Sequence, residues 1–92
     1  MAEKIRASLT VNGLVQGVFF RYRAQLEGQQ LGLTGWIKNN EDGTVSALVE
    51  GEKDKINEFI KWCHQGSDQA KVDEVKVNWQ TYMGEFKNFE IK

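Results

Sequence analysis

The stretch KIRASLTVNGLVQGVFFRYRAQLEGQQLG, residues 4–32, changes its apolar spacing once and so predicts a strand, a loop and a helix. Over residues 4–12 apolar and polar side chains alternate, which indicates a strand with one face in water. After a loop with two glycines, apolar positions follow helical spacing at Phe20, Ala24, Gly28 and Leu31, and Gly32 marks the helix end. Glycine in a helix costs about 1 kcal/mol relative to alanine, so we expect Gly28 to lie in close contact with the sheet.

The rest of the chain predicts three more strands, a second helix and a short final strand. Residues 34–39 and 44–50 have strand patterns, and the Asn, Asp and Gly residues between them favour a hairpin turn. A helix follows with apolar side chains at Ile56, Phe59, Ile60 and Cys63. A further strand alternates at Val75, Val77 and Trp79, and Phe89 and Ile91 suggest the last one. The order β-α-β-β-α-β predicts an α+β sandwich, with both helices on one face of an antiparallel sheet, as a single domain over residues 1–92.

Composition excludes several classes of protein. Of 92 residues, 12 are Lys or Arg and 13 are Asp or Glu, so the net charge of -1 lacks the positive field of a nucleic-acid binder. The one cysteine, Cys63, permits no internal disulfide, and no cluster of cysteine and histidine has the spacing of a zinc site. The N-terminal residues do not resemble a signal peptide, and no run of about 20 apolar residues could span a bilayer. We therefore expect a soluble, cytoplasmic protein with no membrane or nucleic-acid partner.

The segment from Asn12 to Arg21 carries the strongest functional signal. It leads from a strand through a glycine-containing loop into a helix, whose N-terminal N–H groups and partial positive charge suit an anion. Arg21 in the first turn can add a guanidinium that pairs with two phosphate oxygens. These residues alone are equally compatible with a tight connection that carries a surface arginine. They match neither the Walker loop nor the dinucleotide fingerprint.

A covalent cysteine mechanism does not fit this segment. Phosphatases with a C-x5-R loop have their nucleophile six positions before the arginine, and Val15 occupies that position here. Cys63 lies on the apolar stripe of the second predicted helix, where a cysteine fills core volume.

Two motifs resemble the signatures of the acylphosphatase family. Gly13-x-Val15-Gln16-Gly17-Val18-x-Phe20-Arg21 resembles the first, and Leu31-Gly32-Leu33-x-Gly35-Trp36-Ile37-x-Asn39 with Asp42-Gly43 resembles the second. The resemblance covers essentially the whole chain and implies a ferredoxin-like sandwich with strand order 4-1-3-2. It implies Arg21 and Asn39 as catalytic residues and a phosphate-binding loop that uses the backbone of Val15, Gln16, Gly17, Val18, Phe19 and Phe20. The sequence departs from the family pattern at three places, none of which is an implied catalytic or phosphate-binding residue. Gly28 replaces a common alanine, Ile37 replaces a usual valine, and the chain ends at Lys92 without an aromatic residue.

The resemblance also implies a reaction, the hydrolysis of an acyl phosphate to a carboxylate and inorganic phosphate. A carboxylate leaving group has a pKa of about 4 and departs without a general acid. The enzyme then has to hold the phosphoryl group and place a water in line with the leaving oxygen. Arg21 and the loop are expected to hold it and Asn39 to orient the water, with no cofactor, metal or covalent intermediate. We expect a monomer with a small-molecule acyl phosphate as substrate and inorganic phosphate as product and inhibitor.

Other notable residues are expected to serve the fold. His64 suits a helix C-terminus, Trp62 and Trp79 suit packing, and Trp36 suits packing or the support of Asn39. Glu41 and Asp42 are expected to be turn residues. Three alternatives remain: an RNA-recognition domain, which needs paired aromatics and more positive charge; a small-molecule sensor domain; and an accessory domain of a larger maturation enzyme.

Overall fold

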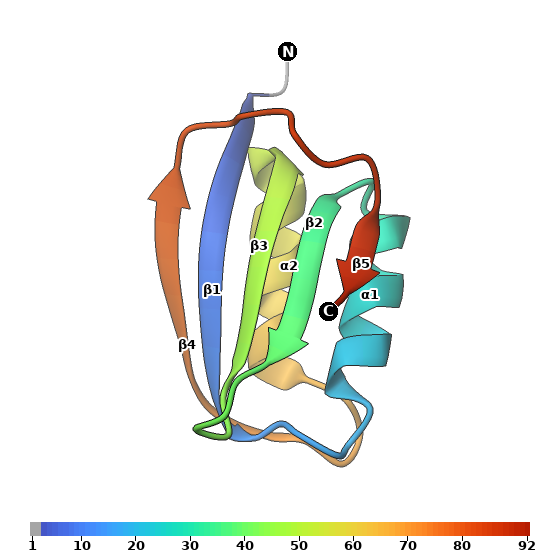
Figure 1. The fold of residues 1–92 in the computed structure, drawn as a ribbon, viewed down its shortest axis with the longest axis vertical. Coiled ribbons are helices and arrows are strands. Elements are labelled where there is room, and N and C mark those ends of the chain that lie inside the picture. Colours follow the sequence, from blue (N-terminus) through green and yellow to red (C-terminus); the bar gives the residue numbers. More distant parts are fainter. Residues whose placement is uncertain (1–2) are drawn as a thin grey trace.

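The computed structural model describes residues 3–92, so the first two residues of the expected domain and of the N-terminal stretch lie outside the described residues. The elements are β1 (Lys4–Leu14), α1 (Phe20–Gln30), β2 (Thr34–Asn39), β3 (Val45–Glu52), α2 (Lys53–Gln65), β4 (Lys71–Gln80) and β5 (Phe89–Ile91) (Figure 1). The predicted order of elements is confirmed, and most boundaries lie within two residues of those predicted.

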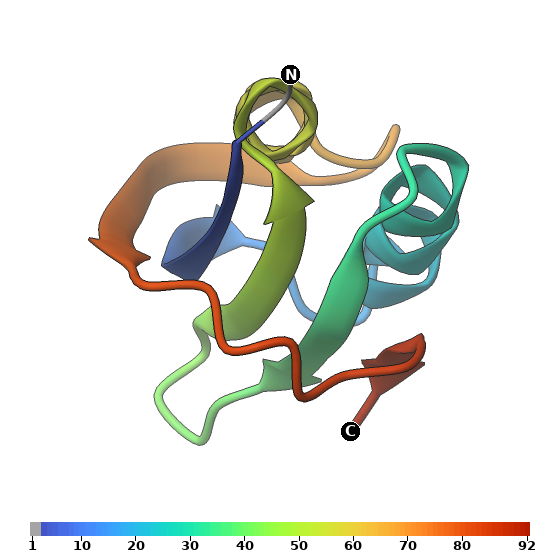
Figure 2. The same ribbon diagram turned by 90° about the horizontal axis from the view of Figure 1, so that it is seen from above.

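The sheet has the strand order β4-β1-β3-β2-β5. Its first four strands follow the expected order 4-1-3-2 and pair antiparallel, whereas β5 pairs parallel with β2. The sheet is therefore mixed, and the antiparallel expectation holds for four of its strands. The reason is the path of residues 81–88, which leave β4 at the end of the sheet where β2 begins (Figure 2). A strand that starts there must run in the same direction as β2.

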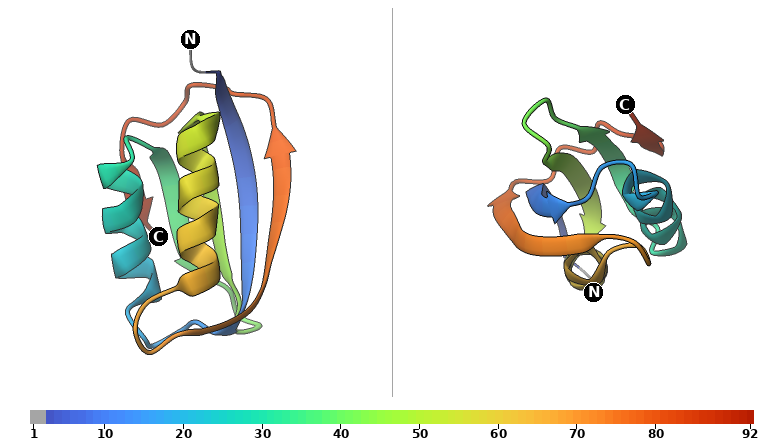
Figure 3. Two further views of the ribbon diagram at one scale, coloured as in Figure 1. Left: turned by 180° about the vertical axis from the view of Figure 1, so that it is seen from behind. Right: turned by 90° about the horizontal axis from the view of Figure 1, so that it is seen from below.

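Both helices cover the same face of the sheet, as predicted, and the core lies between the two layers (Figure 3). On the inward face of β1, Ala7, Leu9 and Val11 are fully buried, because side chains alternate between the two faces of a strand and this face packs against the helices. One cluster holds the buried apolar side chains from both halves of the chain: Ala7, Leu9, Val11, Val15, Val18, Phe20, Ala24, Leu33, Ile37, Val45, Ala47, Val49, Ile56, Phe59, Cys63 and Phe89.

The short strand β5 is held against α1 by close packing. A Cβ atom on Gly28 would lie 2.6 Å from two carbons of the Phe89 ring, so the expected close contact of this glycine is confirmed, with β5 as its partner. The Phe89 ring also packs on Phe59, with ring centroids 5.6 Å apart, and the Gln25 side chain donates to the Phe89 carbonyl at 2.9 Å. Gly28 thus lets α1 approach the edge of the sheet, where β5 ends beside the loop that precedes α1.

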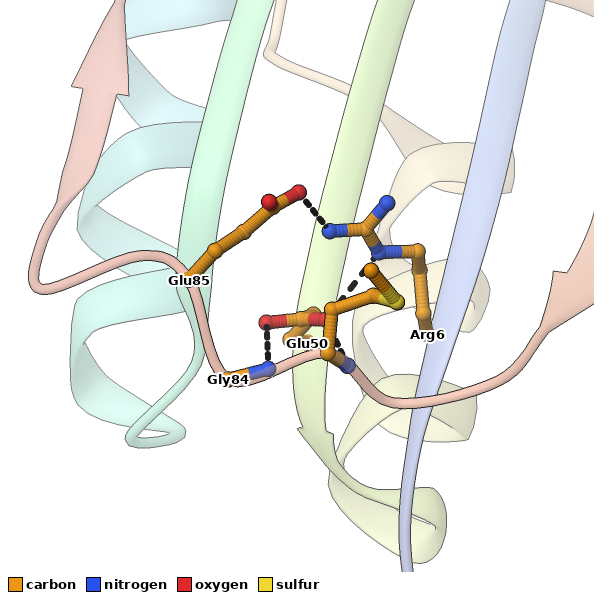
Figure 4. Close-up of polar contacts among 5 residues, drawn as sticks. Arg6, Glu50, Gly84 and Glu85 are labelled. Atoms are coloured by element: carbon orange, nitrogen blue, oxygen red, sulfur yellow. Dashed lines mark hydrogen bonds and ion pairs between the residues drawn. The ribbon is translucent and has the colours of Figure 1, made fainter.

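A buried carboxylate fixes the connection that leads to β5. Glu50 is 1% exposed although it lies on the face of the sheet opposite the helices, because residues 81–88 cover it. Its carboxylate accepts hydrogen bonds from Arg6 Nε at 3.0 Å, Met83 N at 2.7 Å and Gly84 N at 3.2 Å (Figure 4). Arg6 also pairs with Glu85. This network determines where the connection crosses the sheet.

Candidate active site

The loop between β1 and α1 is shaped by buried anchors and by two residues with positive φ. Val15 and Val18 point into the core, while Gly17 and Phe19 are exposed. Gly17 has φ 75°, and Phe19, the N-cap residue of α1, has φ 62° and ψ 21°. A bulky residue in the left-handed region is strained by about 1–3 kcal/mol, a feature that recurs at functional sites. The strained residue, Phe19, lies directly before the first turn of α1.

Arg21 and this loop line one hollow of about 270 Å³. Its walls are Val15, Gly17, Phe19, Phe20, Arg21, Tyr22 and Ile91. Ile91 comes from β5, so the end of the chain closes one side. The structure therefore gathers Arg21 with most of the predicted phosphate-binding residues. Gln16 and Val18 do not line this hollow.

Asn39 is the last residue of β2 and lies at the same end of the molecule as the loop (Figure 1). It is on the inward face with Ile37, whose β-sheet partner is Ile91 of the hollow wall. Asn39 is not itself among the residues that line the hollow. Its Oδ1 is buried and accepts no hydrogen bond from any residue in the described part of the chain. A buried amide oxygen without a donor calls for a bound molecule, such as a water, to supply one.

The Gln16 side chain ties the loop to the β2–β3 turn. Its Nε2 donates to the Asn40 carbonyl at 2.7 Å and to the Thr44 carbonyl at 2.9 Å. Thr44 in turn donates to the Asp42 carboxylate through its hydroxyl at 2.6 Å and its N–H at 3.0 Å, and these bonds lower the pKa of Asp42. The turn directly after Asn39 is thus held rigidly beside the loop. The family resemblance implied only a backbone role for Gln16, since no spacing rule reveals a side chain that reaches the β2–β3 turn.

The loop is also tied to the connection between α2 and β4. Ser67 Oγ donates to the Val18 carbonyl at 2.7 Å. Beside this bond lies a second hollow of about 260 Å³, lined by Val18, Phe19, Tyr22, Arg23, Ser67, Asp68 and Gln69. Phe19 and Tyr22 therefore separate two adjoining hollows.

The tryptophans, the cysteine and the histidine are not among the residues that line the Arg21 hollow. Trp36 is on the opposite face of β2 from Asn39 and contacts Lys38 and Lys92, so the suggested support of Asn39 is not observed. Trp62 packs on Phe20, with ring centroids 5.3 Å apart. Cys63 is buried, and burial raises the pKa of its thiol. The structural role predicted for Cys63 agrees with this environment.

The described residues 3–92 contain neither a group of metal-ligating side chains nor a membrane-spanning helix. Within that range no three His, Cys, Asp or Glu side chains are grouped so that they could hold a metal ion. Neither helix of the described chain has the length and apolar character needed to cross a membrane.

Comparison with known proteins gives a consistent picture. The family model described as Acylphosphatase matches residues 7–91. The chain is 45% identical over 92 residues to an acylphosphatase of Geobacter metallireducens, covering 100% of this chain and 99% of the relative. The crystal structure of acylphosphatase from Bacillus subtilis superposes with a TM-score of 0.93 at 34% identity, covering 96% of this chain and 98% of that one. Full-length HypF, in its phosphate- and nucleotide-bound form, has a TM-score of 0.90 at 28% identity, but the match covers only 12% of it.

Proposed function

The chain belongs to the acylphosphatase family, and on that premise we propose that Arg21 and the loop backbone hold the phosphoryl group while Asn39 orients the attacking water. The protein is a hydrolase that converts an acyl phosphate into a carboxylate and inorganic phosphate. The observation that carries the proposal is the buried Asn39 Oδ1, which has no hydrogen-bond partner among residues 3–92 and lies at the same end of the molecule as the Arg21 hollow.

The phosphoryl group is held mainly by fixed dipoles and one cation. Backbone N–H groups of residues 15–20 lead into the positive end of α1, and Arg21 lies in the first turn of that helix. A guanidinium can pair with two phosphate oxygens at once. The loop is held from two sides, by Gln16 and by Ser67, so these donors need little reorganisation when charge develops on the phosphoryl oxygens.

Asn39 supplies an acceptor for the attacking water. A water that donates one hydrogen to Oδ1 directs a lone pair toward phosphorus. The new P–O bond forms as the bond between phosphorus and the acyl oxygen breaks, and that bond's electron pair leaves with the carboxylate. An amide is too weak a base to take the water proton, so a phosphoryl oxygen receives it. The leaving carboxylate needs no proton, so the proposed reaction requires no general acid, and its nucleophile is the water and not a side chain.

The test is the loss of benzoyl phosphate absorbance in EDTA for the full chain and its variants. Removing one preorganised donor costs about 100- to 1000-fold in rate, so we expect a loss at least that large for Arg21→Ala. Asn39→Ala removes the acceptor that positions the water, and misplacing a reactant costs at least about 100-fold. Arg21→Ala should also weaken inhibition by inorganic phosphate. Asn78→Ala, a change at an exposed asparagine on β4, is the matched control and should keep full activity. Full turnover by a folded Asn39→Ala variant would refute the role of Asn39.

Several properties of the whole protein form part of the same proposal. We propose one domain, because a single apolar cluster joins both halves of the chain. We propose a monomer whose site is built from the loop before α1, the first turn of α1 and β5. A cytoplasmic location is supported by the free, buried thiol of Cys63, which suits a reducing compartment. Inorganic phosphate should inhibit the enzyme, because it resembles the phosphoryl group that the site is proposed to hold.

A further inference from the structure

Two aromatic side chains beside the proposed phosphate site are left in water. Phe19 is 73% exposed and Tyr22 is 55% exposed, although both lie within two residues of Arg21. Neither ring fills the core, because both are exposed. Exposed aromatic surface at a site gains free energy when a ligand covers it. The reaction mechanism assigns no role to either ring.

These rings form the wall between the two hollows. On one side lies the hollow of Arg21, closed by Ile91 of β5. On the other lies the hollow of about 260 Å³ that is bounded by residues 67–69. This volume is just below the range of about 300–1,000 Å³ typical of sites for drug-sized ligands, so it suits a small organic group. The bond from Ser67 to the Val18 carbonyl holds its far wall in place.

In-line displacement determines which side the acyl group occupies. The leaving oxygen must lie opposite the attacking water across phosphorus. In the proposed mechanism the water is held by Asn39 on β2, and β2 lies next to the β5 side of the Arg21 hollow. The acyl group then points away from β2, past Phe19 and Tyr22, toward residues 67–69.

We propose that the hollow between the first turn of α1 and residues 67–69 receives the acyl group, and that Phe19 and Tyr22 favour aromatic acyl groups over small aliphatic ones. This inference rests on the proposed function, because it takes the position of the water from Asn39. It assigns to this protein a substrate preference that hydrolysis of an acyl phosphate does not require. Loss of one aromatic contact to the acyl group should lower kcat/KM about 3- to 10-fold.

The test compares kcat/KM for benzoyl phosphate with kcat/KM for acetyl phosphate. Tyr22→Ala should lower the ratio of the two values about 3- to 10-fold, and Tyr22→Phe, which retains the ring, should keep it. The matched control is Leu26→Ala, which removes an apolar side chain that is 37% exposed one turn further along α1 and outside both hollows. This control should leave both substrates unchanged.

Each failure has a distinct signature. If the unmodified protein hydrolyses neither substrate, the proposed function fails. If it hydrolyses both and Tyr22→Ala leaves the ratio unchanged, only the acyl site is overturned. If Tyr22→Ala lowers kcat/KM for both substrates and weakens phosphate inhibition by the same factor, the ring belongs to the phosphate site. A preference for acyl groups that carry a carboxylate, lost in Arg23→Gln, would also overturn the aromatic assignment.

Discussion

Replacing Glu50 by glutamine should destabilise this protein far more than the same change at Glu85, although both carboxylates bind Arg6. The Glu50 side chain has 0% relative exposure, whereas that of Glu85 has 50%. Oε2 of Glu50 accepts from Arg6 and Met83, and Oε1 accepts from Gly84. A glutamine retains one oxygen, so its NH2 group must face at least one of these donors. The substitution removes the negative charge and points an N–H donor of the glutamine at another buried N–H donor.

The magnitude follows from this geometry. Breaking a buried ion pair by removing one partner costs about 3–5 kcal/mol. Arg6 retains Glu85 and has 12% side-chain exposure, so water relieves part of the loss, and about 2–3 kcal/mol is expected for Glu50→Gln. Glu85→Gln breaks an exposed pair and should cost about 0–1 kcal/mol. Against a total stability of about 5–15 kcal/mol, the first change is large.

Urea unfolding followed by tryptophan fluorescence measures both variants. The m-value should stay constant, which shows that the free energy of unfolding changed and not the surface exposed. Activity gives a second readout, because the connection that Glu50 holds leads to β5 and to Ile91 in the site wall. A loss below about 0.5 kcal/mol for Glu50→Gln, or equal losses for the two variants, would refute the idea that buried Glu50 anchors the connection.

Three further changes test other contacts. Gly28→Ala should cost about 1–2 kcal/mol in urea unfolding, because overpacking against Phe89 exceeds the gain in helix propensity of about 1 kcal/mol; a more stable variant would show that the ring yields. Gln16→Ala should raise KM and the inhibition constant of phosphate together, since the loop loses its tie to the β2–β3 turn, and unchanged constants would contradict this. Cys63 should resist iodoacetamide until the protein unfolds, because burial raises the pKa of its thiol. The folded pKa lies above the unfolded value of about 8.5, so the contribution of Cys63 to stability should fall as pH rises above that value, and Cys63→Ala should make the pH dependence less steep there.

Much of the architecture could be predicted because it rests on local patterns. The alternation over residues 4–12 and the helical spacing from Phe20 determine which face of each element is apolar, and an apolar face must be buried. The glycine-containing loop before Arg21 predicts a helix N-terminus with an adjacent cation. The motif resemblance then placed Asn39 at the end of a strand, where the structure has it.

Residues distant in sequence decided the remaining features. The parallel pairing of β5 depends on the path of residues 81–88, which Glu50 holds from the middle of the sheet. Glu50 itself follows the alternation of β3 as an outward residue, yet it is buried because a segment more than thirty positions away covers it. Such contacts leave no periodic signal, because they depend on where the chain returns in space.

The same division applies to the site. By themselves, the residues of the sequence are as compatible with a tight connection as with an anion-binding loop and its arginine, and the family resemblance favours the loop, whose entry into a helix would fix the direction of the backbone N–H groups. Only the tertiary structure shows that Asn39 Oδ1 is buried without a donor, that Gln16 links the loop to the β2–β3 turn, and that two hollows adjoin at Phe19 and Tyr22. These features arise where four separate segments meet, and their geometry exists only once the sheet and helices have packed.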